Sequence, residues 1–146
     1  MTNSRHGIAY ATCAWCVLFG APHLWWALGW PFGFPGGRAM YNLFMSSAWR
    51  VAFNGFVIGC CALGVLVALT LSMPQISTAR RRVTLVLAWI AFVLLSLRGL
   101  AGLIVDQLQD HIWDPTFVVG GALFGAVIWR ARRSRRTYAA LPSRQG

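Results

Sequence analysis

The sequence predicts an all-α, polytopic membrane protein, built as a bundle of four transmembrane helices with both termini in the cytoplasm. Of its 146 residues, 58% are apolar and only 11% are charged, whereas a soluble domain carries about 25% charged residues. Apolar runs close to the length that crosses a bilayer recur four times along the chain. Most of the arginines lie in segments that fall on one side of these runs.

The four predicted spans cover about residues 7–30, 48–71, 83–105 and 115–130, within a transmembrane domain of residues 1–133. The first run follows Arg5 as in a signal peptide, but it is longer than a signal peptide's apolar region and lacks a small-residue cleavage site. The fourth run is the shortest, so we expect it to tilt little or to lean on its neighbours. Asp114 and Pro115 suit the N-cap and the first position of its helix.

Arginine placement orients these spans. The chain has 13 basic residues, all arginine, and a formal net charge of +10. Arg5 precedes the first span, residues 80–82 lie between the second and third, and five arginines within residues 130–136 follow the fourth. The positive-inside rule assigns these groups to the cytoplasmic side. The other side then receives a Pro/Gly loop (residues 31–47) and an Asp-rich turn (residues 106–114), as in a multi-pass protein of the bacterial cytoplasmic membrane.

The expected partners follow from the same charges. Residues 134–146 form an Arg-rich tail, predicted to be disordered or to lie on anionic lipid at the cytoplasmic face. A strongly basic chain can also bind nucleic acid. That partner is excluded here because the arginines bracket apolar runs instead of lining a polar face.

Small residues at helical spacing predict how the bundle packs, because they let helices approach closely in lipid. In the first span they share a stripe with His23, which therefore faces inward. The residues concerned are Cys13, Cys16, Gly20, His23 and Ala27 in the first span, Gly55, Gly59, Gly64 and Ala68 in the second, Gly99 and Gly102 in the third, and Gly121 and Gly125 in the fourth.

Polar residues gather in the outer half of the predicted bundle. His23 and Arg98 lie at similar depth, because both of their helices run outward. Asn54 enters from outside, and the acids lie just above. The predicted ligand-binding residues are His23, Trp26, Asn54, Arg98, Asp106, Asp110, His111 and Asp114.

Two interpretations stay open for each central residue. Arg98 is unfavourable in the membrane by about 2.5–3.5 kcal/mol. In the structural interpretation it snorkels or pairs with Asp106 or Asp114. In the functional interpretation it contacts an anion or a polar head group. His23 either forms a hydrogen bond with Asn54, a backbone carbonyl or Asp106, or it transfers protons or binds a ligand. His23 and Asp106 are thus the candidate catalytic residues, and whether the protein is an enzyme stays open.

Other chemistries find little support. No nucleotide loop, nucleophile motif or metal-ligand spacing is present, so we expect neither a metal nor another cofactor. Cys13 and Cys16 have the spacing of thiol redox motifs, and Cys60 and Cys61 form a second pair. Their predicted positions, in the inner half and in mid-span, favour buried packing residues over a membrane thiol oxidase.

Residues 23–29, His-Leu-Trp-Trp-Ala-Leu-Gly, resemble the signature of a family of small bacterial four-span proteins that carries only a domain-of-unknown-function label. That signature reads His-x-Tyr/Trp-Trp-Ala-Leu-Gly-Gly at the end of the first span, and this chain departs from it at Trp30. A later Asp, aromatic and Pro segment corresponds to residues 110–115, followed by the glycines of the last span. The resemblance implies the four-span fold and marks His23, Trp26 and the Asp/Pro turn, but it implies no activity.

The leading functional hypothesis is an outward-facing polar pocket that binds a small or lipid-like ligand. The alternative is a structural or accessory subunit whose glycine stripes pack against a larger protein partner or a second copy of the chain. A transporter is less favoured, because no polar residue continues the path through the inner half of the bundle.

Overall fold

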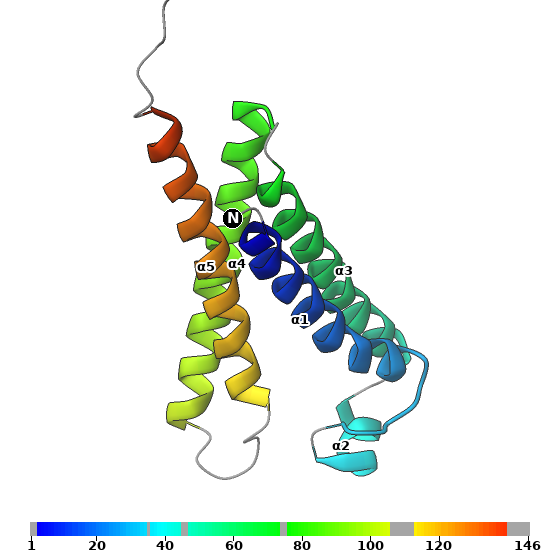
Figure 1. Ribbon diagram of the computed structural model, residues 1–146. Helices are drawn as coiled ribbons and strands as arrows, with labels where there is room; N and C mark the ends of the chain where they lie inside the picture. Colours follow the sequence, from blue (N-terminus) through cyan, green and yellow to red (C-terminus); the bar gives the residue numbers. More distant parts are fainter. Residues whose placement is uncertain (1–2, 35, 45–46, 74–75, 106–112, 140–146) are drawn as a thin grey trace, which may run out of the picture.

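The computed structural model describes residues 3–34, 36–44, 47–73, 76–105 and 113–139, and this part of the chain is all-α (Figure 1). The all-α prediction is confirmed. Four long helices correspond to the four predicted apolar runs, although the first helix ends three residues before the predicted end at residue 30. One short helix lies between the first two. The helices are α1 (Asn3–Ala27), α2 (Gly37–Phe44), α3 (Ser47–Ser72), α4 (Thr78–Val105) and α5 (Trp113–Ala139).

Three of these helices are long and apolar enough to cross a membrane, over His6–Ala27, Ala48–Ser72 and Thr78–Ile104. The distribution of side chains agrees with a lipid environment. Large apolar side chains such as Leu18, Phe56 and Leu94 are exposed, whereas Asn54 and Asp114 are buried. A water-soluble domain shows the opposite preference.

The long helices form two pairs. α1 packs along α3, and α4 packs along α5, with fewer contacts between the pairs. The pairs share one apolar core that includes Cys16, Val67, Ala88, Phe124 and Ile128. Toward the end that carries α2, the α1–α3 pair and the α4–α5 pair diverge (Figure 1).

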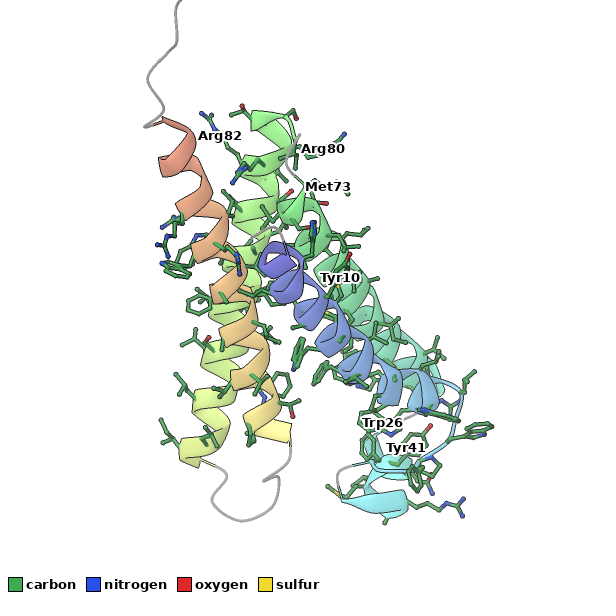
Figure 2. All side chains as sticks on the ribbon, viewed as in Figure 1. Tyr10, Trp26, Tyr41, Met73, Arg80 and Arg82 are labelled. Atoms are coloured by element: carbon green, nitrogen blue, oxygen red, sulfur yellow. The ribbon has the colours of Figure 1, made fainter. Side chains whose placement is uncertain are left out.

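The two ends of the molecule differ in chemistry. Arg80–Arg82 at the start of α4 and Arg130, Arg132 and Arg133 in α5 form what we call the Arg end, where the Arg81 Nη2 donates to the Ala131 carbonyl at 2.5 Å. Trp25, Trp26 and Trp30 mark the opposite end, the Trp end. Figure 2 shows Arg80 and Arg82 at one extreme and Trp26 with Tyr41 at the other. The predicted gathering of these two arginine groups at one end is confirmed.

Glycine contacts hold α4 against α5 as predicted. A Cβ on Gly99 would lie 2.8 Å from the Val118 nitrogen, and one on Gly121 would lie 2.5 Å from the Ser96 Oγ. Such distances leave no room for a side chain, so these glycines set the spacing between the two helices.

The packing prediction for the second span is wrong at Gly55 and Gly59. A Cβ on either glycine would have nothing within 4 Å. Each residue turns by about 100° around a helix, and the buried stripe of α3 runs through Asn54, Gly64 and Ala68 instead. Gly55 and Gly59 therefore lie on the open side of α3.

The predicted loop of residues 31–47 is also wrong in part, because it contains α2. Tyr41 is buried on one side of this short helix and its hydroxyl donates to the Trp26 carbonyl at 2.7 Å. In addition, α5 begins at Trp113. Asp114 thus lies inside the first turn, where the sequence predicted an N-cap before the helix.

Candidate functional site

His23 and Asn54 form a buried hydrogen bond between α1 and α3. The His23 Nδ1 and the Asn54 Oδ1 are 2.9 Å apart, and His23 is only 6% exposed. The Asn54 Nδ2 donates to the Arg50 carbonyl at 2.8 Å. Because this fixes the amide nitrogen as a donor, the Oδ1 is the acceptor and the His23 Nδ1 carries the proton. The predicted hydrogen bond between His23 and Asn54 is confirmed.

Aromatic rings surround the His23 imidazole. The Trp26 ring meets it edge-on at 4.8 Å between centroids, and the Phe19 and Phe53 rings lie at 5.5 and 6.1 Å. Within the described residues the His23 Nε2 has no hydrogen-bond partner. The imidazole is therefore oriented through one nitrogen and enclosed mostly by apolar rings.

Trp26 connects α1 to the segment that follows it. Its Nε1 donates to the Phe32 carbonyl at 3.0 Å, and its own carbonyl accepts from the Tyr41 hydroxyl. Phe34 packs edge-on against both Trp26 and Tyr41. Trp26 thus fixes the loop and α2 beside the His23 pair.

Arg98 and Asp114 form an ion pair between α4 and α5. The Arg98 Nη1 donates to the Asp114 Oδ1 at 2.7 Å, with the Asp114 side chain 3% exposed and the Arg98 side chain 50% exposed. The guanidinium also lies over the Phe117 ring, 5.1 Å from its centroid. Gly102 makes room for this pair, since a Cβ there would overlap the Asp114 carboxylate. The predicted interhelical ion pair is confirmed for Asp114.

Phe19 and Phe117 connect the two polar pairs. Their rings meet edge-on at 5.1 Å, so the contacts run from Arg98 over Phe117 and Phe19 to His23. Trp15 stacks on Phe19 at 5.1 Å and donates from its Nε1 to the Thr116 carbonyl at 3.1 Å. This aromatic bridge (Trp15, Phe19 and Phe117) joins α1 to α5.

The predicted ligand-binding residues therefore fall into three groups. His23, Trp26 and Asn54 lie together on the α1–α3 pair, and Arg98 and Asp114 lie together on the α4–α5 pair. Asp106, Asp110 and His111 lie outside the described residues.

The aromatic bridge was not predicted from the sequence, although the sequence does show the part of it that lies on α1. Trp15, Phe19, His23 and Trp26 recur at spacings of four, four and three, which places them on one face of α1. Nothing in the spacing indicates that Phe117 of α5 meets that face.

The four cysteines are free thiols with different surroundings. Cys16 is buried beside Gly64, Cys61 lies against Gly20, and Cys60 is exposed on α3. The Cys13 Sγ faces the Val65 carbonyl at 3.9 Å. Contacts of Cys16 and Cys61 with helix-packing glycines fit small residues that fill helix interfaces.

The described residues contain no group of three His, Cys, Asp or Glu side chains that could hold a metal ion. What the fold and site define is a helical protein of membrane type, with a buried polar pair between α1 and α3 and a half-exposed ion pair between α4 and α5. No protein-family model, no curated protein and no solved structure matches this chain.

Proposed function

We propose that the chain is a four-span protein of a bacterial cytoplasmic membrane, with both termini in the cytoplasm and the Trp end facing outward. Residues 115–129 of α5 are almost entirely apolar and span roughly 22 Å at about 1.5 Å per residue. This is short of the hydrocarbon thickness of about 30 Å. Arg132 and Arg133 stack on Trp89 and Trp129, which suits arginines that extend along the helix toward a nearby membrane surface. The family that residues 23–29 resemble has the same number of spans.

A reporter fused to the C-terminus tests whether α5 crosses the membrane. Four spans place both termini on the same side, so green fluorescent protein fused at either end fluoresces and alkaline phosphatase fused at either end is inactive. An active phosphatase at the C-terminus, with an N-terminal fusion still fluorescent, would mean that only three helices cross.

We further propose that the half of the helix bundle nearer the Trp end binds an amphiphile whose anionic head group contacts Arg98. The observation that carries this proposal is the half-exposed Arg98 side chain, whose guanidinium lies over the Phe117 ring. Its Nη1 is occupied by Asp114, whereas its other N–H groups have no hydrogen-bond partner among the described residues. Charged donors form the stronger hydrogen bonds with anionic oxygens.

The surroundings of Arg98 favour a lipid-like body for the ligand. Phe117 lies under the guanidinium and contacts Phe19 of α1. Exposed Leu94 and Leu97 lie on the same helix as Arg98. An acyl chain is the ligand body that such apolar side chains accommodate in a membrane. His23 and Asn54, being buried and paired with each other, position α1 against α3 in this proposal and do not contact the ligand.

The retained ligand can be identified after extraction from the native membrane. We expect mass spectrometry to find an anionic amphiphile bound to the wild type, and at least one such molecule per chain fewer on the double variant Arg98→Gln/Asp114→Asn. The double variant keeps a neutral hydrogen bond between the two side chains, which avoids leaving a buried charge unpaired. Arg132→Gln serves as a matched control, because it also removes a ring-stacked arginine. Equal retention by all three proteins would contradict the proposal.

The second candidate function is a structural subunit, and the open side of α3 favours it. Gly55 and Gly59 are spaced four apart and have nothing within 4 Å of a Cβ position, which is the arrangement through which membrane helices associate closely. Gly55→Leu should then abolish association with a partner or second copy while leaving the isolated chain folded. Gly121→Leu, which collides with Ser96 inside the chain, should unfold it. Unchanged association of Gly55→Leu would exclude this face.

A further inference from the structure

A hollow of about 700 Å³ opens at the Trp end, beyond the His23 pair. It is formed by the last turn of α1, the loop that follows and the start of α2. Its volume falls in the range of about 300–1,000 Å³ that is typical of ligand sites. The lining residues are Trp25, Gly29, Trp30, Pro31, Phe32 and Arg38.

Hydrogen bonds fix the walls of this hollow. The Gly29 nitrogen donates to the Trp26 carbonyl and the Trp30 nitrogen donates to the Trp25 carbonyl, at 3.1 and 3.0 Å. Gly29 has a φ of 94°, which only glycine adopts readily. The turn brings the Trp25 and Trp30 rings into a stack at 4.9 Å between centroids. The hollow therefore has a preformed aromatic wall.

The charge around the hollow is positive. Arg38 lines it directly, and the Arg50 Nη1 lies 3.8 Å from the position where a Cβ on Gly29 would stand. The Arg50 Nε is buried without a hydrogen-bond partner in the described part of the chain. Among the described residues the only acid is Asp114, which is paired with Arg98. Two arginines thus lie near one hollow with no described carboxylate to neutralise them.

We propose that this hollow binds the phosphate of an anionic phospholipid of the outer leaflet. Arg38 would contact the phosphate, with Arg50 adding positive charge from behind Gly29, and the Trp25–Trp30 wall would contact the glycerol region. Arginine suits phosphate oxygens, and tryptophan prefers the depth at which head groups meet hydrocarbon. Phe32 lines the hollow and is exposed, which favours a lipid over a free phosphate. The inference rests on the proposed orientation in the membrane but not on the amphiphile site at Arg98.

Site-directed photocrosslinking tests the proposal locally, so that lipids at the Arg end do not interfere. Phe32 lines the hollow and is 89% exposed, so Phe32→p-benzoylphenylalanine should fold normally. The full chain is placed in nanodiscs with equal amounts of phosphatidylglycerol and phosphatidylcholine, irradiated, and the adducts are weighed. Both lipids carry the phosphate, but the choline cation of phosphatidylcholine is repelled by the two arginines. We therefore expect phosphatidylglycerol adducts to exceed phosphatidylcholine adducts by about tenfold.

Arg38→Gln should bring the two adducts to equal amounts, whereas the control Arg132→Gln at the Arg end should leave the ratio unchanged. Arg98→Gln/Asp114→Asn should also leave the adduct ratio unchanged. The experiment therefore tests the proposal for the hollow separately from the proposal for the amphiphile site. An equal ratio in the starting protein, or an unchanged ratio in Arg38→Gln, would overturn the proposal. Loss of the adduct on adding glycerol phosphate at millimolar concentration would identify a soluble phosphate as the ligand and overturn the lipid assignment.

Discussion

Gly102→Ala should destabilise the protein by displacing the Asp114 carboxylate. A Cβ on Gly102 would overlap the carboxylate carbon and both of its oxygens. Because Asp114 is buried, the carboxylate has to move away within packed surroundings, and its 2.7 Å contact with Arg98 breaks. A single methyl group thus removes the ion pair between α4 and α5.

The expected magnitude combines three effects. Overpacking a well-filled site costs about 1–3 kcal/mol. Losing a hydrogen bond between charged groups costs about 1.5–3 kcal/mol, at the low end here because Arg98 is half exposed. Replacing glycine by alanine in a helix raises the free energy of unfolding by about 1 kcal/mol, which offsets part of this loss. We therefore expect Gly102→Ala to lower the free energy of unfolding by about 1.5–3.5 kcal/mol.

The assay is reversible unfolding in mixed detergent micelles, followed by circular dichroism. Gly55→Ala is the matched control, since a Cβ there meets nothing within 4 Å and should leave the free energy of unfolding equal or raise it by up to about 1 kcal/mol. In an Asp114→Ala background, Gly102→Ala should cost little more, because the displaced carboxylate is already gone. A Gly102→Ala protein as stable as the wild type, or equal losses for Gly102→Ala and Gly55→Ala, would refute this reasoning.

Two further predictions concern the Trp end. His23→Leu should lower the free energy of unfolding by about 1–3 kcal/mol because it removes the buried hydrogen bond between the His23 Nδ1 and the Asn54 oxygen. In equilibrium unfolding, His23→Leu/Asn54→Leu should lose less than the sum of the two single variants. Additive losses in this double-mutant cycle would mean that the hydrogen bond contributes nothing. Tyr41→Phe removes the hydroxyl that donates to the Trp26 carbonyl. The free energy of global unfolding should stay within about 1.5 kcal/mol of the wild type, whereas amide hydrogen exchange in α2 should become faster. Unchanged exchange in α2 would contradict the role assigned to that contact.

The sequence predicted the long helices because their apolar runs are nearly uninterrupted, and it predicted the Arg end because arginine positions along the chain fix it. It also named both polar pairs, each as one of several possible contacts. Asn54 and Asp114 were among the few side chains that could pair with His23 and Arg98 at similar depth, so composition alone narrowed the choice. Scarcity of polar residues, and not any motif, made these contacts predictable.

The errors share a physical cause, which is that helix rotation depends on neighbours. Gly55 and Gly64 both looked like packing residues, but only Gly64 lies on the side of α3 that meets Cys16 and Phe124. α2 was missed because the Pro and Gly residues before it favour a loop. Its order depends on the burial of Tyr41 against Trp26, a contact that the local sequence does not reveal.

The central claim is that Arg98 receives the anionic head of an amphiphile, and a binding isotherm for oleate tests it most directly. We expect purified wild type in neutral detergent to bind oleate at least about tenfold more tightly than oleyl alcohol, because a charged head group strengthens the hydrogen bond to the guanidinium. Arg98→Gln/Asp114→Asn should bind the two molecules equally, and Arg38→Gln should behave as the wild type. Equal affinity of the wild type for oleate and oleyl alcohol would contradict the account.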